Sequence, residues 1–551
     1  MARKVPISFD RYYNYEEIMH YLNEVVTAYP ELASLESIGK SYEKRDIPAL
    51  TLTDRSCGSP ENKPALYVEA NIHAGEVTGC MTALNLIDLL LNGTEDDAKI
   101  HRLLEKYTFY ILPRVNPDGA EYYLTTPGSL RSSVRPWPEL GMENLPGLHP
   151  QDIDGDGMIL QMRLRDDKRG AWKISKRDKR LMLPREPWDS EEVFYRLLPE
   201  GLVNNYSGEP FEVVRSPFNL DMNRNFPSNW NPGVQGGGDY PTSEPEVRGV
   251  VEFITAHPNI ALANSYHTFG GIFFRNPYQY GDEAIDQMDL KCIRAIAAEG
   301  TKVTGYPDVK SSNRACLPEW LYEHKGVIGF TTELWDRNGQ AGIDRAEAAK
   351  AATPEEKEEI QIRLLNWNDR ALASAGFSNW KTFEHPQLGS VEIGGWDPKY
   401  NLQNPPAFLL AGETYKNALW SIREAACLPH LCFDEIKQEK LDGKLWKITV
   451  TVINEGFLAT NITNKALALK AVKPDCVSLE GAEILNGKKS VPLGNLQGYA
   501  NAHFGGGWGA SLPTSLGKAV WLVKGTAGDV ITLTAKSIRG GKDVITFSLA
   551  D

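Results

Sequence analysis

The sequence has no long apolar run and no apolar leader. None of its stretches approaches the roughly 18 consecutive apolar residues of a membrane-spanning helix. The N-terminus, MARKVPISFDRYYNYEE, lacks the apolar core of a signal peptide. We therefore expect no membrane span. We expect a cytoplasmic protein unless a signal that led to secretion or to the periplasm has been removed.

Cysteine is scarce and follows no pattern. The seven cysteines are scattered along the chain, without a CxxC pair or a regular disulfide framework. Their odd number leaves at least one without a partner in the same chain. Cys427 and Cys432 are near enough in sequence to form a disulfide, but the lack of a pattern favours free thiols.

The chain also has fewer basic than acidic residues. The formal net charge is −13, and no block of Lys and Arg is long enough to follow a phosphate backbone. This charge argues against nucleic acid or an anionic membrane as the main partner. It fits a soluble, acidic enzyme better.

The length predicts more than one domain. With 551 residues, 42% of them hydrophobic, the chain is too long for one compact unit. Strands alternate with helices over residues 1–385, which predicts an α/β domain with a mixed, mostly parallel sheet and helices on both faces. The expected strands are residues 47–53, 64–72, 107–115, 260–267 and 326–334, and the expected helices are residues 13–30, 77–93, 243–258 and 282–300.

Other segments depart from this alternation. Residues 136–220 are rich in Pro, Gly and charge, which predicts a long insertion on the surface of the α/β domain. The charged residues 345–376 should be helical and largely solvated. Short β-type runs between Gly and Asn turns predict a small β-sandwich accessory domain at 430–551, joined by a connecting segment at 386–429.

His73 and Glu76 stand three apart in YVEANIHAGEVTG (67–79), where an apolar strand ends and a helix begins. At the C-terminal end of a strand, both side chains can lean toward one ion. A polar pair at an ordinary turn explains the same spacing. A catalytic zinc site needs a third protein ligand and an open position for water. His267, at the end of the expected strand 260–267, is the candidate, although a lone histidine there is also a common turn residue.

Two further positions carry polar groups suited to peptide chemistry. Glu333 lies inside the apolar run GVIGFTTEL, where an unpaired carboxylate is costly to bury. It is either the partner of a distant Arg or Lys, or a general base beside a metal-activated water. In DMNRNFPSNW (221–230), Asn223 and Arg224 together suit a carboxylate ligand. The alternative is a surface loop held by turn hydrogen bonds.

Taken together, the motifs resemble those of the zinc metallocarboxypeptidases of the carboxypeptidase A type, peptidase family M14. The resemblance spans about residues 10–385, and the motifs, in the order of that family, are HAGE (73–76), NPDG (116–119), DMNRN (221–225), SYH (265–267) and FTTEL (330–334). It implies a carboxypeptidase-like fold and one zinc ion, with His73, Glu76 and His267 as its ligands.

The resemblance also implies roles for the other candidates. Glu333 would be the general base, and Asn223 with Arg224 would hold the C-terminal carboxylate of the substrate. The family uses an arginine a dozen residues after its NPDG-like turn to stabilise the oxyanion. Counting from that turn gives Arg131, with Arg135 as the alternative.

The sequence departs from the family at several positions. Gly75 stands where animal digestive members carry an arginine, so a secondary substrate contact should be missing. The mobile tyrosine that the family places some nine residues before Trp320 falls near Ser311, so that role is empty or filled from elsewhere. Glu319, in the region that shapes the pocket for the terminal side chain, would favour a basic residue, but the register does not fix its place.

The expected insertion contains HPQDIDGDGMILQMR, in which Asp152, Asp154 and Asp156 alternate and Gly157 provides a tight turn. This is the first half of a calcium loop. Arg163 stands where such loops normally supply a bidentate glutamate, so a distant carboxylate would have to complete the site. A plain acidic turn is the alternative to a structural Ca²⁺ site.

These features predict a zinc-dependent metallocarboxypeptidase that hydrolyses the C-terminal peptide bond of peptides or proteins through a metal-activated water. A related zinc amidase or peptidase, acting on cell-wall peptides or removing an acyl or glutamyl group, is the nearest alternative because cell-wall stems also end in a carboxylate. A third alternative is a non-catalytic binding protein that works through its β domain. The sequence fixes neither the preferred C-terminal residue nor the oligomeric state.

Overall fold

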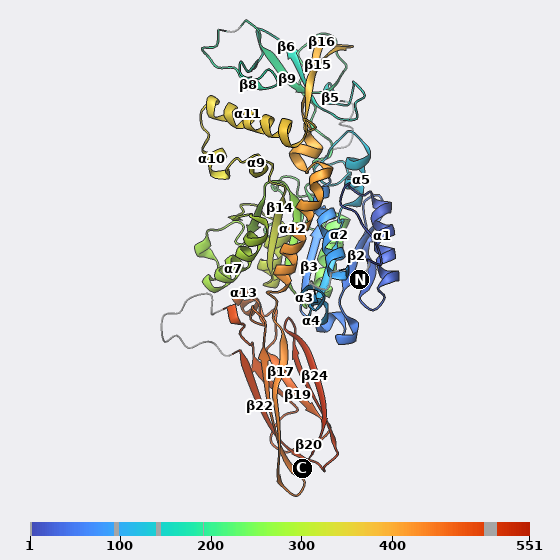
Figure 1. The fold of residues 1–551 in the computed structure, drawn as a ribbon, viewed down its shortest axis with the longest axis vertical. Coiled ribbons are helices and arrows are strands. Elements are labelled where there is room, and N and C mark those ends of the chain that lie inside the picture. Colours follow the sequence, from blue (N-terminus) through green and yellow to red (C-terminus); the bar gives the residue numbers. More distant parts are fainter. Residues whose placement is uncertain (1–2, 93–97, 139–144, 191, 501–514, 551) are drawn as a thin grey trace.

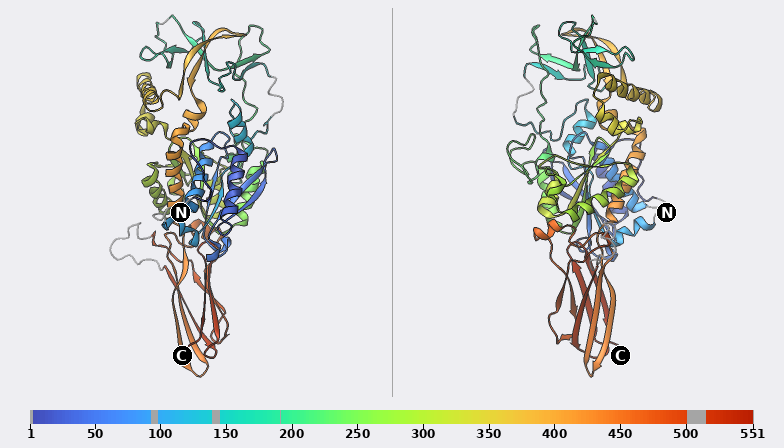
Figure 2. Two further views of the ribbon diagram at one scale, coloured as in Figure 1. Left: turned by 45° about the vertical axis from the view of Figure 1, so that its right-hand side comes forward. Right: turned by 90° about the vertical axis from the view of Figure 1, so that its left-hand side faces the viewer.

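The protein is elongated and has three parts stacked along its longest axis. The structure, a computed structural model, describes residues 3–92, 98–138, 145–190, 192–500 and 515–550. In Figure 1 an α/β body occupies the middle, a smaller sheet that contains β6, β9, β15 and β16 lies above it, and the strands from β17 to β24 lie below. The two views in Figure 2 keep this order.

The α/β body is built on an eight-stranded sheet in the order β1-β2-β4-β3-β11-β14-β12-β13. The pairs β4–β3, β3–β11, β11–β14 and β12–β13 are parallel, and the other three pairs are antiparallel. The predicted mixed and mostly parallel sheet is therefore confirmed. Its strands are β1 Ala33–Lys40, β2 Asp46–Leu52, β3 Ala65–Ala70, β4 Thr108–Leu112, β11 Ile260–Thr268, β12 Ile272–Arg275, β13 Asp308–Lys310 and β14 Ile328–Leu334.

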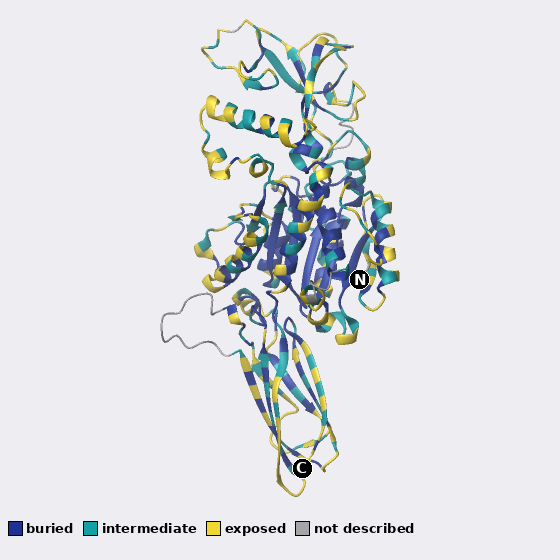
Figure 3. Cartoon of the chain, viewed as in Figure 1, coloured by how far each residue is buried: buried dark blue, intermediate teal, exposed yellow. Residues whose placement is uncertain are grey.

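Helices cover both faces of this sheet, and Figure 3 shows the sheet as the most buried part of the molecule. On β3, Leu66 and Val68 belong to one core, whereas Ala65 and Tyr67 belong to the other. This alternation follows the two-residue period of a strand. The first core includes α1 Tyr15–Ala28, α2 Val77–Asn92, α7 Gln287–Thr304 and α12 Ala407–Ala425, and the second includes α6 Pro245–Ala256 and α8 Leu317–Trp320.

The charged residues 345–376, which we expected to be helical and largely solvated, are helical over most of their length and form two helices. Helix α10 spans Arg345–Lys350 and α11 spans Pro354–Ala371. Pro354 has no backbone N–H to continue a helix and is well suited to start one. The Thr353 side chain caps the new helix by accepting a hydrogen bond from the Glu356 backbone N–H.

The NPDG segment, for which the sequence indicated a turn, is the first turn of a helix. Helix α5 spans Pro117–Thr125, and the Asn116 side chain accepts a hydrogen bond from Gly119 N at 2.9 Å. Asn116 is therefore an N-cap with proline at the first helical position. Gly93, the expected end of the helix that follows β3, lies outside the described residues.

The expected insertion contributes strands to a second sheet, whose order is β15-β16-β6-β9-β7-β8. Strands β15 Phe377–His385 and β16 Gly389–Trp396 come from much later in the chain, and Glu392 of β16 pairs with Arg163 of β6. The strands within 136–220 are β5 Gly147–Pro150, β6 Gln161–Arg165, β7 Trp172–Ile174, β8 Met182–Pro184, β9 Tyr195–Pro199 and β10 Gly201–Asn204, of which β5 and β10 form a separate two-stranded sheet.

Two four-stranded antiparallel sheets, β17-β18-β22-β20 and β21-β19-β23-β24, form the C-terminal part and enclose a common core. This all-β architecture agrees with the predicted sandwich. The strands are β17 Leu431–Asp442, β18 Leu445–Asn454, β19 Asp475–Glu480, β20 Glu483–Ile484, β21 Ser490–Gly494, β22 Leu516–Lys524, β23 Val530–Ser537 and β24 Gly541–Ser548.

Residues 386–429, which we expected to connect the two domains, hold β16 and α12, and α12 packs against the α/β body. The domain boundaries themselves stay predictions. All seven cysteines are free thiols. Among the described residues, no helix is both long enough and apolar enough to cross a bilayer. The remaining α-helices are α3 Ala98–His101, α4 Leu103–Lys106, α9 Arg337–Gln340 and α13 Asn464–Ala468.

Candidate metal centre

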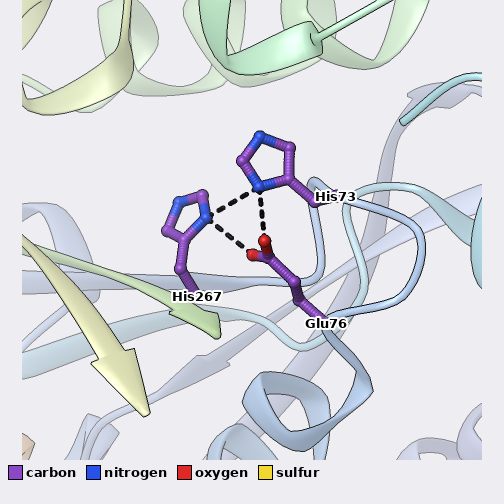
Figure 4. A group of neighbouring side chains, drawn as sticks. All are labelled: His73, Glu76 and His267. Carbon is purple, nitrogen blue, oxygen red and sulfur yellow. Dashed lines mark hydrogen bonds and ion pairs between the residues drawn. The ribbon is translucent and has the colours of Figure 1, made fainter. Parts of the chain in front are cut away.

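Three buried side chains converge at the C-terminal ends of β3 and β11. His73 Nδ1 lies 2.9 Å from Glu76 Oε1, His267 Nδ1 lies 2.8 Å from Glu76 Oε2, and the two Nδ1 atoms are 3.0 Å apart (Figure 4). Their residues are only 1–3% exposed. The sequence predicted this group, and the fold brings His267 to it from a distant part of the chain.

The turn after β3 sets the direction of the first two side chains. Asn71 adopts a positive φ of 61°, which asparagine tolerates better than most residues. Its side-chain amide donates to the carbonyls of His73 at 2.7 Å and Ala74 at 3.1 Å. The turn thus holds His73 and Glu76 together before α2 begins at Val77.

The donor set fits zinc. Two imidazole nitrogens and a carboxylate are ordinary zinc ligands, with bonds of about 2.0–2.2 Å, so donors about 3 Å apart can share one ion. Burial disfavours the charged form of Glu76, but His73 and His267 hold the pKa of its carboxyl well below the usual range. The carboxylate is therefore ionised, as a metal ligand must be.

Asp221, which the sequence did not single out, contacts the candidate ligand His73. Its Oδ1 lies 2.9 Å from His73 Nε2, on the opposite side of the ring from the converging Nδ1. A carboxylate in this position fixes the imidazole tautomer and orientation for metal binding. The signal was present in the sequence, because Asp221 opens the DMNRN motif that already supplied Asn223 and Arg224.

A second chain of polar groups supports His267. Its Nε2 lies 3.1 Å from Ser265 Oγ, which donates to Glu69 Oε1 at 3.0 Å. Glu69 also accepts from the Tyr67 hydroxyl at 2.7 Å, and burial raises the pKa of its carboxyl to about 7. An acid inside the buried strand YVEANI was the sequence signal for this support.

Arg131 lies against the converging group. Its Nη1 is 3.2 Å from Glu76 Oε1, and its Nε donates to Asp221 Oδ2 at 3.0 Å. Arg135, the alternative from the sequence, instead forms two hydrogen bonds to the buried carboxylate of Glu244. The geometry therefore favours Arg131 as the cation of the site.

Glu333 belongs to the same edge of the sheet, since it pairs in register with His267 across β14 and β11. Burial, with Glu76 as the next cause, raises the pKa of Glu333 well above its usual value, while Arg131 and Arg224 act in the opposite direction. A glutamate with a raised pKa beside a metal site has the basicity that a general base needs at neutral pH.

Asn223 and Arg224 lie on the other flank of His267. Asn223 Nδ2 is 3.5 Å from His267 Nε2, and its Oδ1 accepts from Leu317 N at 3.1 Å. Arg224 donates to Asn313 Oδ1 at 2.8 Å and to the Asn223 carbonyl, also at 2.8 Å. Within the described residues Arg224 forms no ion pair, so its charge is available to an anionic ligand.

The three departures from the family have structural counterparts. A Cβ at Gly75 would lie 2.5 Å from Gln403 Oε1, so Gln403 occupies the space next to it. Near the position where the family carries its mobile tyrosine, this chain has the buried Ser311. Tyr278, a buried tyrosine elsewhere in the chain, forms a 3.1 Å hydrogen bond through its hydroxyl with Thr331 Oγ1. Glu319 accepts from Asn229 Nδ2 and Ala315 N, each at 2.7 Å, which leaves its carboxylate engaged by the protein.

The carboxylates of Asp152, Asp154 and Asp156 gather in one loop. Asp152 accepts from the backbone N–H of Gly155 at 2.7 Å and of Gly157 at 3.0 Å. Glu200 is the distant carboxylate at this loop, and it accepts from the backbone N–H groups of Ile153, Asp154 and Leu160. Arg163 turns away to pair with Glu392.

The order of these residues agrees with a comparison to known families, in which the model of the zinc carboxypeptidases matches residues 18–349. The chain belongs to the zinc carboxypeptidase family. A second match, over residues 430–548, is to a domain of unknown function. The family membership implies Zn²⁺, for which the group of His73, Glu76 and His267 provides the ligands that fit.

Similarity to individual relatives is partial. A zinc carboxypeptidase of Saccharothrix mutabilis subsp. capreolus is 37% identical over 127 residues, which are 23% of this chain and 29% of that protein. Carboxypeptidase A4 of Mus musculus is 25% identical over 350 residues, 61% of this chain and 65% of that protein. The chain therefore spans less than two thirds of either relative.

Among solved structures, carboxypeptidase A from Helicoverpa armigera aligns with a TM-score of 0.41 and 18% identity over 68% of this chain and 76% of that chain. Other relatives of this chain are described as inactive metallocarboxypeptidases. Family membership therefore does not by itself establish hydrolysis by this chain.

Proposed function

We propose that the protein is a zinc-dependent metallocarboxypeptidase that removes the C-terminal residue of peptides or proteins. The observation that carries the proposal is the buried group of His73, Glu76 and His267, with Glu333 on the neighbouring strand. A zinc ion held there would polarise the scissile carbonyl and activate water for hydrolysis. The inactive relatives make the presence of a candidate base important.

The charges of Glu333 and Arg131 suit two different catalytic roles. Glu333 takes the proton from the attacking water and passes it to the leaving amine, because its raised pKa suits both transfers. Arg131 stabilises the negative charge that develops on the carbonyl oxygen. Its contacts with Glu76 and Asp221 hold its guanidinium beside the site before substrate arrives.

Selection of the chain terminus is assigned to Asn223 and Arg224. A guanidinium that has no acidic partner among the described residues suits a free carboxylate, and the adjacent amide adds a neutral donor. Binding the terminal carboxylate at a fixed distance from the metal ligands places the last peptide bond for attack. This arrangement supports an exopeptidase.

A zinc amidase or peptidase that acts on cell-wall peptides, or that removes an acyl or glutamyl group, shares the requirement for a nearby carboxylate and stays the alternative. Dansylated dipeptides, their C-terminal amides and muropeptides, assayed with the purified chain before and after zinc removal, separate the two. We expect hydrolysis of the free-acid dipeptides, loss on chelation and recovery with zinc. Cleavage of muropeptides alone would refute the carboxypeptidase, and zinc binding without any hydrolysis would indicate a binding protein.

Structural calcium at Asp152, Asp154 and Asp156 stays a prediction. Glu200 stabilises the loop by accepting backbone hydrogen bonds. Its carboxylate therefore holds the loop that carries the three aspartates and is not available as a further calcium ligand. Calcium titration by calorimetry, with an Asp152→Asn/Asp154→Asn variant as control, tests the site. Equal heats for both proteins would identify the loop as a plain acidic turn.

A further inference from the structure

A cavity of about 670 Å³ adjoins the candidate base. Gly270 lines it three residues after His267, and Trp335 lines it two residues after Glu333. A Cβ at Gly270 would lie 4.0 Å from Glu333 Cβ. The cavity therefore lies close to Glu333, although neither Glu333 nor the candidate metal ligands are among the residues that line it.

The lining of this cavity excludes the residues that would hold the substrate terminus. Asn223, Arg224 and Asn313 are not part of it. A peptide whose terminal carboxylate lies at Arg224 and whose last peptide bond lies at the metal ligands has to leave the site in another direction. The cavity beside Glu333 is in place to receive the residues on the amino-terminal side of that bond.

Two arginines give the cavity its charge. Arg337 donates to Asn401 Oδ1 at 3.1 Å and stacks over the Trp396 ring at 5.0 Å, and Arg345 donates to the Gly270 carbonyl. In the part of the chain that the structure describes, neither arginine pairs with a carboxylate. Burial lowers the pKa of Arg337 to about 10, so the guanidinium is still charged at neutral pH.

The acidic groups close to these arginines are already engaged. Asp336 also lines the cavity, but its carboxylate accepts from the Gly339 N–H at 2.9 Å and caps α9. Glu347, on the same helix as Arg345, pairs with Arg363. A partly buried guanidinium without a counter-charge is costly, and an anionic ligand would supply that charge.

The remaining wall comes from a segment outside the family match. The residues Pro398–Gln403 lie beyond 18–349, and Trp335 Nε1 anchors them by donating to the Asn401 carbonyl at 2.8 Å. Gln403 reaches back to Gly75, where the absence of a Cβ leaves room for it. Position 75 contributes no side chain here, and the two arginines of the cavity come from other segments, at positions 337 and 345.

We propose that this cavity is a subsite that selects an acidic side chain on the amino-terminal side of the scissile bond, with Arg337 and Arg345 binding its carboxylate. The inference rests on the proposed carboxypeptidase function. It assigns the protein to peptides that carry Asp or Glu next to or near the terminal residue. This specificity depends on an ion pair between the carboxylate of the ligand and the arginines. It should therefore weaken as salt screens the site.

N-acylated tripeptides with one common C-terminal residue test the subsite. Glu, Gln or Lys is placed at the first or the second position upstream of the scissile bond, and kcat/KM is measured for each. We expect the Glu peptide to exceed its Gln counterpart by about tenfold at one of the two positions, as for a charge-assisted hydrogen bond. The Lys peptide should be the poorest, and the ratio should shrink with added salt.

Variants identify the source of the preference. Arg345→Gln, at an exposed residue, and Arg337→Gln should each bring the Glu/Gln ratio toward one, chiefly by lowering kcat/KM for the Glu peptide. Arg337→Lys keeps the charge and should keep most of the ratio, which separates charge from loss of packing on Trp396. Arg248→Gln, an exposed arginine on α6, changes the net charge equally and should change nothing.

A wild-type protein that hydrolyses the Glu and Gln peptides equally, or a ratio that survives in both glutamine variants, overturns the subsite while the proposed function stands. Failure to hydrolyse any peptide of the series refutes the proposed function and the subsite together. Melting temperatures of all variants establish that the comparison is made between folded proteins.

Discussion

The carboxylate of Asp221 joins His73 to the neighbouring cation of the site. Its Oδ1 lies 2.9 Å from His73 Nε2, and its Oδ2 accepts from Arg131 Nε at 3.0 Å. One acidic side chain therefore orients a candidate metal ligand and the candidate oxyanion-binding arginine at the same time. A change at Asp221 should affect both metal affinity and catalysis.

Asp221→Asn should weaken zinc binding by about 10–100-fold, because the amide orients the imidazole but does not support its basicity. Competition with a chromophoric chelator measures the affinity directly. Asp239→Asn, at an exposed partner of Arg135, is the matched control. Unchanged zinc affinity in Asp221→Asn would show that His73 does not depend on this contact.

Glu333→Gln should lower kcat by about 10²–10⁴-fold while the protein still binds one zinc per chain, because the amide removes the base and leaves the ligands in place. Metal analysis and peptide assays on the same sample provide both readings. Glu347→Gln, which removes a carboxylate paired with Arg363, serves as the control. Full activity in a zinc-loaded Glu333→Gln protein would exclude Glu333 as the base.

Arg224→Gln should raise KM for free-acid peptides by about 10–100-fold, as expected for the loss of a hydrogen bond between charged groups. The weak hydrolysis of the matching C-terminal amides should not change, since they offer no carboxylate. The ratio of the two rates is the measurement. An equal effect on acids and amides would mean that Arg224 supports the fold rather than the substrate terminus.

Glu424 of α12 should make the stability of the protein depend on pH. Its side chain is buried, and burial raises the pKa of the carboxyl to about 8, against about 4.3 in an unfolded chain. Because the folded-state pKa is the higher one, the contribution of Glu424 to stability is fully present below about pH 4 and is lost as the pH rises through about 8. Glu424→Gln removes this ionisation.

Melting curves of Glu424→Gln and wild type between pH 5 and pH 9 check this expectation. The variant should melt at the higher temperature at pH 9, and the difference should narrow at pH 5. Glu439→Gln, at an exposed surface pair with Lys447, should show no such trend. Parallel curves for Glu424→Gln and wild type would exclude the ionisation of Glu424 as a source of pH dependence.

The sequence reached the α/β fold because helix and strand periodicity is a local property. The buried strand ending before His73 and the strand ending in His267 were visible as apolar runs with turn signals. The same locality explains one error. The NPDG segment has the composition of a turn, but in the fold it follows β4 and starts a helix, with Asn116 as its N-cap.

The sequence by itself determined the chemical inventory: two histidines at strand ends, Glu76 at a fixed spacing, Glu333 in an apolar run, and an Asn–Arg pair. The type of each side chain and its spacing from the next follow directly from the order of residues, without knowledge of the fold. Only the tertiary structure favoured Arg131 over Arg135, brought Asp221 to His73, and set Gln403 beside Gly75. Those contacts join residues far apart in the chain, and their distances are set by how the strands and helices pack.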